Sequence, residues 1–202
     1  MLLKTDMTPF RLTNSEFWIG SLLVMSAVAI SLLGNWEPSV ESWGYWLFSR
    51  VFSETGQFFI PDRSPFYTLY ILLFRWIGFP GSMIAEYTAT MVFTVLSLAL
   101  FARPYLGWWV ALFFGILWIP FLQESEPPVQ NLALGFSCLA VYFRAKGETP
   151  KNLTIFYLFL GLAYLFRVTY SAMVLIFLAW DTATILRARK RKPTLTLSKS
   201  FQ

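Results

Sequence analysis

The chain has 202 residues, of which 56 % are hydrophobic and only 13 % are charged, and its net charge is +5. Soluble domains carry roughly 25 % charged residues, so this composition excludes a soluble globular protein. The chain has no histidine, which excludes histidine-based catalysis and histidine metal sites, and its one cysteine excludes a disulfide framework. Successive apolar runs of nearly membrane-spanning length predict a polytopic α-helical membrane protein.

The first apolar run, Phe17–Gly34, follows a short N-terminal segment that contains Lys4 and Arg11. No small-residue cleavage site follows this run, so we expect an uncleaved first crossing and not a signal peptide. We place the N-terminus on the cytoplasmic side, and the run then ends outside.

A long connection, residues 35–82, follows the first crossing and carries acidic residues among many aromatic ones. The segment Ser39–Thr55 predicts a helix with one face formed by Val40, Trp43, Leu47 and Val51, and another formed by Glu41, Tyr45, Ser49 and Phe52. The segment Pro65–Phe79 is apolar, but about 15 residues at ~1.5 Å each reach only ~22 Å. We therefore expect both helices to lie at the outer membrane surface without crossing it.

Charge in the later connections orients the remaining crossings. The basic segment 144–151 and the cluster of Arg187, Arg189, Lys190, Arg191 and Lys192 predict cytoplasmic loops, and the acidic segment 123–128 predicts an external loop. Arg103 is expected in a tight cytoplasmic turn before Pro104, and a break near Arg167 keeps the basic tail inside. The expected crossings are Phe17–Gly34, Met83–Ala102, Tyr105–Leu122, Pro127–Phe143, Leu153–Phe166 and Val168–Leu186.

The sequence thus predicts an all-α membrane protein with about six transmembrane helices and a large external loop that contains two membrane-lying amphipathic helices. Residues 1–186 would form the multi-pass module, and residues 187–202 a basic, polar cytoplasmic tail. A basic cluster next to a membrane helix is typical of a cytoplasmic anchor and not of nucleic-acid binding. We expect an integral protein of a bacterial or archaeal cell membrane, with membrane lipids as its surroundings.

Several motifs occur in a fixed order along the chain. Glu41 is followed by Tyr45 and then Gly56, and RSPFYTLYILLFRWIG spans Arg63–Gly78. The acidic stretch QESEPP then precedes an apolar run that ends in RAKG, and GLAYLFRVTY spans Gly161–Tyr170. In this order the motifs resemble the GT-C class of membrane glycosyltransferases, whose members include aminoarabinose transferases, protein O-mannosyltransferases and oligosaccharyltransferase catalytic subunits.

The resemblance implies transfer of a sugar from a polyprenyl-phosphate carrier to an acceptor on the external face. Glu41 would be the catalytic base, with glutamate where the class more commonly has aspartate. Arg63, Tyr67 and Arg167 would bind the lipid phosphate, and Glu124 and Glu126 would hold a divalent metal ion such as Mg²⁺ or Mn²⁺. Class members usually continue beyond a sixth crossing, so we expect a fragment, a truncated form or a short member that requires a partner subunit.

The residues also allow less specific interpretations. Glu41 could be a solvated acid on an interfacial helix, and Glu124 and Glu126 could be loop acids that favour a following helix N-terminus. Arg167 could form a structural ion pair, and Arg75 is expected to extend to the interface or to pair locally. The alternative function is a non-enzymatic multi-pass scaffold or a transporter component, although the chain lacks the internal repeat expected of a transporter.

Overall fold

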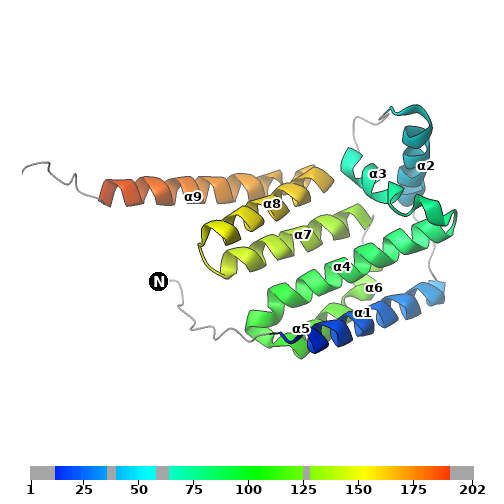
Figure 1. Ribbon diagram of the computed structural model, residues 1–202, viewed down its shortest axis with the longest axis horizontal. Helices are drawn as coiled ribbons and strands as arrows, with labels where there is room; N and C mark the ends of the chain where they lie inside the picture. Colours follow the sequence, from blue (N-terminus) through cyan, green and yellow to red (C-terminus); the bar gives the residue numbers. More distant parts are fainter. Residues whose placement is uncertain (1–11, 36–39, 58–63, 125–127, 192–202) are drawn as a thin grey trace, which may run out of the picture.

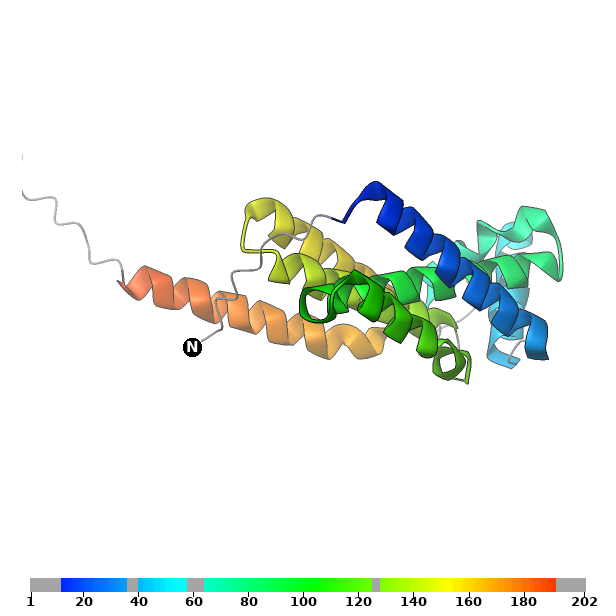
Figure 2. The same ribbon diagram turned by 90° about the horizontal axis from the view of Figure 1, so that it is seen from below.

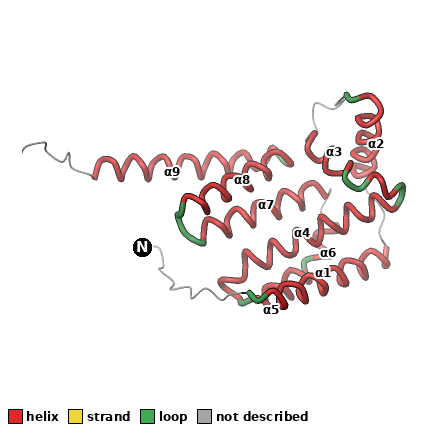
Figure 3. Tube along the Cα trace, in the orientation of Figure 1, coloured by secondary structure: helices red, strands yellow, loops and turns green. Residues whose placement is uncertain are grey.

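The computed structural model describes residues 12–35, 40–57, 64–124 and 128–191. These residues contain nine α-helices, two 3₁₀ helices and no strand, which confirms the all-α class for the described chain (Figure 3). The helices are α1 (Asn14–Asn35), α2 (Val40–Thr55), α3 (Pro65–Leu72), η1 (Arg75–Ile77), α4 (Gly81–Leu106), α5 (Trp108–Leu117), α6 (Ile119–Glu124), α7 (Pro128–Ala145), α8 (Pro150–Phe166), η2 (Val168–Tyr170) and α9 (Ser171–Arg191).

Among the described residues, three helical segments are long and apolar enough to cross a membrane: Asn14–Leu33, Gly81–Leu106 and Val168–Leu186. Two shorter apolar helices, Trp108–Leu117 and Pro150–Phe166, accompany them. Since about 20 apolar residues are needed to span the hydrocarbon layer, these lengths indicate a membrane protein.

The longer helices run roughly along the long axis, staggered from α1 on one side to α9 on the other, and successive ones run in opposite directions (Figures 1 and 2). The start of α1 and the end of α9 both point away from the end of the bundle where α2 and α3 lie. Helix α4 lies centrally, in contact with α1, α5 and α7, whereas α7 pairs with α8. The connection after the first helix therefore covers one end of the bundle.

Polar residues at helix starts explain several boundaries. Thr13 and Glu16 form reciprocal hydrogen bonds before α1, with the Thr13 amide 2.9 Å from Glu16 Oε2 and the Glu16 amide 3.2 Å from Thr13 Oγ1. This is a capping box, which satisfies amides that have no partner inside the helix. Ser64 and Thr149 cap α3 and α8 in the same sense, each followed by a proline in the first turn.

The expected single crossing Tyr105–Leu122 is wrong in its boundaries, and the expected turn at Arg103 is wrong as well. Helix α4 continues through Arg103 and Pro104 to Leu106, and the chain turns at Gly107, whose φ of 74° favours glycine. A second break at Trp118 divides α5 from α6. Pro120 has no amide hydrogen to bond the carbonyl four residues earlier, which explains this break.

Other expectations for the helices agree with the structure. The chain breaks at Arg167, which is extended with φ −145° and ψ 111° between α8 and η2, as expected. The apolar segment after Arg63 forms only an eight-residue helix and a 3₁₀ turn, so it is too short to cross a membrane. In α2, the face with Tyr45 and Ser49 is buried and the face with Trp43 and Leu47 is exposed.

Helices α4 and α7 approach closely where α7 has a glycine. A Cβ atom at Gly135 would lie 2.6 Å from Cε1 of Phe93, closer than side-chain atoms can approach. The Phe93 ring packs against Phe136, with ring centroids 4.8 Å apart. This contact brings the polar residues of α4 within reach of α7 and its neighbours.

Candidate functional site

Helices α2 and α3 are attached to the bundle end by specific contacts. The Ser64 hydroxyl donates to the Leu165 carbonyl at 2.6 Å, which joins the start of α3 to the end of α8. The Trp46 indole donates to Ser82 Oγ at 3.1 Å, which joins α2 to the start of α4. Tyr45 and Tyr67 meet edge to face with ring centroids 4.7 Å apart, so α2 and α3 also pack on each other.

Arg75 strengthens the link between α2 and η1. Its guanidinium donates to the Ser49 carbonyl at 3.2 Å and lies 3.9 Å from the Glu54 carboxylate. The expectation of local pairing for Arg75 is confirmed. Because the interaction with Glu54 is half exposed, it contributes little to stability.

Tyr67 lies beneath this layer and is only 1 % exposed. Its hydroxyl donates to Oε1 of Glu86, a buried carboxylate on α4. Burial, reinforced by the adjacent Glu86, raises the pKa of the Tyr67 phenol well above its usual range. The phenol is therefore protonated at neutral pH and remains a hydrogen-bond donor.

Glu86 has a second hydroxyl partner. Thr90, one turn later on α4, places its Oγ1 3.4 Å from Glu86 Oε1 and 3.2 Å from the Tyr70 hydroxyl. Among the described residues, no cation lies within ion-pair distance of Glu86. The carboxylate is thus held by neutral hydroxyl groups, one of them from α3.

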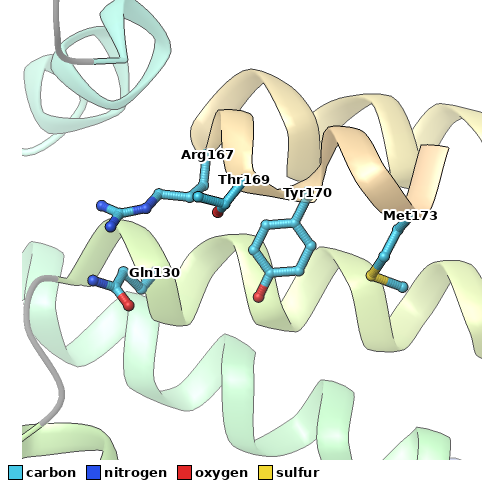
Figure 4. A pocket seen from close by; sticks show the side chains of 5 residues that line it. All are labelled: Gln130, Arg167, Thr169, Tyr170 and Met173. Carbon is cyan, nitrogen blue, oxygen red and sulfur yellow. The ribbon is translucent and has the colours of Figure 1, made fainter. Parts of the chain in front are cut away.

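Arg167 lines an open pocket of about 380 Å³ near the same end of the bundle. The other lining residues, which together with Arg167 define the Arg167 pocket, are Gln130, Thr169, Tyr170 and Met173. Figure 4 shows the Arg167 side chain extending above Gln130, while the Tyr170 ring points toward α7. A guanidinium beside an amide and a hydroxyl is a chemical environment suited to a phosphate group.

The remaining predicted site residues are only partly described. Glu41 lies in the first turn of α2 and Glu124 at the end of α6, but their side chains are outside the described residues, as are Arg63 and Glu126 altogether. Tyr67 and Arg167 are brought to the same end of the bundle, but Tyr67 does not line the Arg167 pocket. The part of the chain that is described contains no group of three potential metal ligands. The assigned roles of these residues stay predictions.

Sequence reasoning overlooked two carboxylates inside apolar helices, Glu86 on α4 and Asp181 on α9. Asp181 lies toward the opposite end of the bundle, where Arg144 donates to its Oδ1 at 2.5 Å and the Tyr157 hydroxyl donates to its Oδ2 at 2.5 Å. Acidic residues in membrane-length helices are costly and usually serve a purpose. That signal alone could have singled out both positions.

The arrangement at the α2 and α3 end therefore combines an open cationic pocket, a layer of tyrosines and a buried carboxylate. The guanidinium of Arg167 suits an anionic ligand, and the rigid aromatic rings beside it can hold the pocket in shape. No protein-family model, no curated protein and no solved structure matches this chain.

Proposed function

We propose that this protein is a GT-C-type membrane glycosyltransferase that moves a sugar from a polyprenyl-phosphate carrier to an acceptor. The observation that supports this most is the Arg167 pocket, which pairs a guanidinium with the Gln130 amide and the Thr169 hydroxyl. The pocket opens near the end of the bundle where α2 and α3 lie. Two of the motifs in the GT-C resemblance touch there, since Ser64 of the Arg63–Gly78 motif donates to Leu165 of the Gly161–Tyr170 motif. A phosphate needs this chemistry, and a lipid carrier needs a site at the membrane boundary.

The proposal includes a membrane arrangement with six crossings: α1, α4, α5 with α6, α7, α8, and α9. The alternating directions of these helices support it, since the start of α1 and the end of α9 point the same way (Figure 1). The basic residues after Leu186 assign that side to the cytoplasm, and α2 and α3 then face outside.

Within this proposal Glu41 accepts the proton of the acceptor hydroxyl as it attacks the anomeric carbon of the sugar. General-base catalysis of this kind contributes about 10²- to 10⁴-fold to a rate. Arg167, with Arg63, binds the phosphate that leaves with the lipid, whereas the Tyr67 hydroxyl is already donated to Glu86. The metal-ligand role expected of Glu124 and Glu126 falls on side chains outside the described residues and stays a prediction.

Labelling of single cysteines tests the membrane arrangement. Gln57 and Glu148 are exposed and lie on the two sides that the proposal distinguishes. Glu148 is preferred to Gly147, whose φ of 123° would strain a cysteine. In a Cys138→Ala background, an impermeant maleimide should label Gln57→Cys from outside and Glu148→Cys only after permeabilisation. External labelling of Glu148→Cys would exclude the six-crossing arrangement.

Binding of undecaprenyl phosphate to the protein in nanodiscs tests the Arg167 pocket. We expect Arg167→Gln to weaken binding about tenfold or more, as the loss of a charge-assisted hydrogen bond implies. Undecaprenol, which lacks the phosphate, should bind equally to both proteins. Arg50→Gln is the matched control, because Arg50 is an exposed cation on α2 that does not line the pocket.

Sugar transfer tests Glu41. With a polyprenyl-phosphate sugar and a partner subunit supplied where required, Glu41→Gln should retain binding of undecaprenyl phosphate and lose about 10²- to 10⁴-fold in transfer rate. If the Gln variant transfers at the full rate and Arg167→Gln binds the phosphate normally, the enzymatic proposal fails. The non-enzymatic scaffold or transporter component would then be the better description.

A further inference from the structure

Glu86 is the least expected polar group at this end of the bundle. It is 4 % exposed and belongs to the membrane-length segment Gly81–Leu106. Burying a carboxylate is costly unless hydrogen bonds compensate for its lost hydration. Its hydrogen-bond partners in the described chain are the hydroxyls of Tyr67 and Thr90. Of these, only Tyr67 comes from another helix, so the contact specifically joins α4 to α3.

Helix α3 depends on such contacts. It has eight residues, far fewer than the 12–15 or so at which isolated helices become even marginally stable in water. Its attachment includes the Tyr67–Glu86 and Thr90–Tyr70 bonds to α4, the Ser64–Leu165 bond to α8, and the packing of Tyr67 and Ile71 in a buried cluster. Of these contacts, the Tyr67–Glu86 bond is the one that involves a buried carboxyl group.

The same attachment reaches the Arg167 pocket through aromatic rings. Tyr67 stacks on Tyr70 at 6.0 Å, and Tyr70 meets Phe166 edge to face at 6.3 Å. Phe166 immediately precedes Arg167. Tyr170, which lines the pocket, packs against the buried cluster that contains Tyr67 and Phe166. A displacement of α3 would therefore reach both sides of the Arg167 pocket.

We propose that Glu86 is a positioning residue: by accepting the Tyr67 hydroxyl, it holds α3 against α4 and α8 and so sets the geometry of the Arg167 pocket. The role of Glu86 in holding α3 is argued from the contacts alone. Its effect on lipid-phosphate binding rests on the function proposed above. A purely stabilising role predicts uniform loosening of the bundle. A positioning role predicts loosening confined to α3 and the pocket.

The test uses Thr68, a buried residue next to Tyr67 that is 3 % exposed. In a Cys138→Ala background, the thiol introduced by Thr68→Cys reacts with a maleimide only when α3 moves away. Glu86→Leu removes the acceptor, Tyr67→Phe removes only the donor, and Glu86→Gln keeps an acceptor oxygen. Ser97→Ala is the control, because it removes another buried hydroxyl from α4 that bonds only within that helix.

We expect Glu86→Leu and Tyr67→Phe to accelerate labelling about ten- to a hundredfold, because each leaves a buried polar group without its hydrogen-bond partner. Combining them should add little, since both break one bond. Glu86→Gln should restore slow labelling, and Ser97→Ala should leave the rate unchanged. Tyr67→Phe is the variant least able to disturb folding, and the proposal is overturned if it labels as slowly as the control. It is also overturned if Glu86→Gln labels as fast as Glu86→Leu.

Undecaprenyl phosphate binding separates this inference from the proposed function. If Glu86→Leu and Arg167→Gln both weaken binding and Glu86→Gln does not, both proposals are supported. If labelling changes as expected but Arg167→Gln binds the lipid normally, the positional role of Glu86 stands and the phosphate site fails. If Glu86→Leu speeds labelling but leaves binding intact while Arg167→Gln weakens it, the link from α3 to the pocket is wrong.

Discussion

Glu86 and Asp181 are two carboxylates that lie in apolar helices toward opposite ends of the molecule. Their surroundings differ in whether a cation is present. Both accept a hydrogen bond from a tyrosine, Tyr67 for Glu86 and Tyr157 for Asp181. Asp181 also pairs with Arg144, whereas Glu86 has no cation partner in the described chain. One site is therefore organised around charge, and the other around hydroxyl donors.

This difference decides what each site tolerates. The guanidinium of Arg144 is a cation, which requires a negative partner when it is shielded from water. The hydroxyls around Glu86 donate to any oxygen acceptor, charged or neutral. The Asp181 site thus acts as an ionic link that ties α9 to α7 and α8, and the Glu86 site acts as a hydrogen-bonded link that ties α3 to α4.

We expect the Asp181 link to contribute more to stability than the Glu86 link, because α9 has few other contacts. None of the membrane-length window in Val168–Leu186 is buried within the described structure. Besides Asp181, contacts of α9 with α8 include the edge-to-face pair of Phe177 and Phe156 at 4.9 Å. Arg144 also lies over the Phe156 ring, 5.6 Å from its centroid. Asp181 is therefore expected to be the main specific attachment of this helix.

The largest expected effect is that of Asp181→Asn. The variant keeps an acceptor for Tyr157 but leaves Arg144 with only the exposed Glu148 as a charge partner, 3.4 Å away. The side chains of the Arg144–Asp181 pair are only 17 % and 18 % exposed. Removing one member of a fully buried pair costs about 3–5 kcal/mol, so we expect about 2 kcal/mol for this partly exposed one. Denaturant titration in mixed micelles would measure the free energy of unfolding.

A double variant sharpens that result. Arg144→Met with Asp181→Leu removes both charges, and such replacements of ion pairs are often neutral. The double variant should therefore be more stable than Asp181→Asn alone. If it is as unstable as the single variant, the cost comes from lost packing and the ionic description of this site is wrong.

A smaller effect on the free energy of unfolding is expected at Glu86. Here the neutral amide should be tolerated better than the apolar side chain. Glu86→Leu should reduce the free energy of unfolding by about 1–2 kcal/mol, because it leaves the buried Tyr67 hydroxyl without an acceptor. Glu86→Gln should cost less than about 1 kcal/mol, because no cation loses its partner. The same titration would measure both, and a larger cost for Gln than for Leu would show that the negative charge itself is required.

The smallest effect is expected for the exposed pair of Arg50 and Glu54, whose side chains are both 56 % exposed and 3.0 Å apart. Helix pairs of this kind contribute about 0.3–0.5 kcal/mol and weaken with salt. Arg50→Ala should therefore lie within experimental error of the parent protein. A loss comparable to that of Asp181→Asn would mean that Arg50 has a role beyond this pair.

Several features of the fold could be predicted from the sequence because they depend on nearest neighbours along the chain. The helix that begins near Ser39 and the break at Arg167 follow from periodicity and loop charge, and both agree with the structure. The boundary between α4 and α5 could not be predicted in the same way. Proline was expected to end a helix at position 104, but a proline near a helix end removes few bonds, and the turn occurs at Gly107 instead.

The site shows the same division. Arg167 and Tyr67 became candidate residues because the motifs that contain them resemble those of GT-C glycosyltransferases, and motifs of this kind can be read from the chain itself. The sequence did not predict that the buried Tyr67 would donate a hydrogen bond to Glu86, 19 positions away. It also did not predict that Asp181 would accept one from Arg144 of α7. Composition and periodicity determined that this is an all-helical chain with helices suited to a membrane, since those properties are sums over local residues. Which carboxylate receives a cation and which receives hydroxyls was decided only by tertiary packing, because a polar group's partner depends on which helices meet and at what rotation.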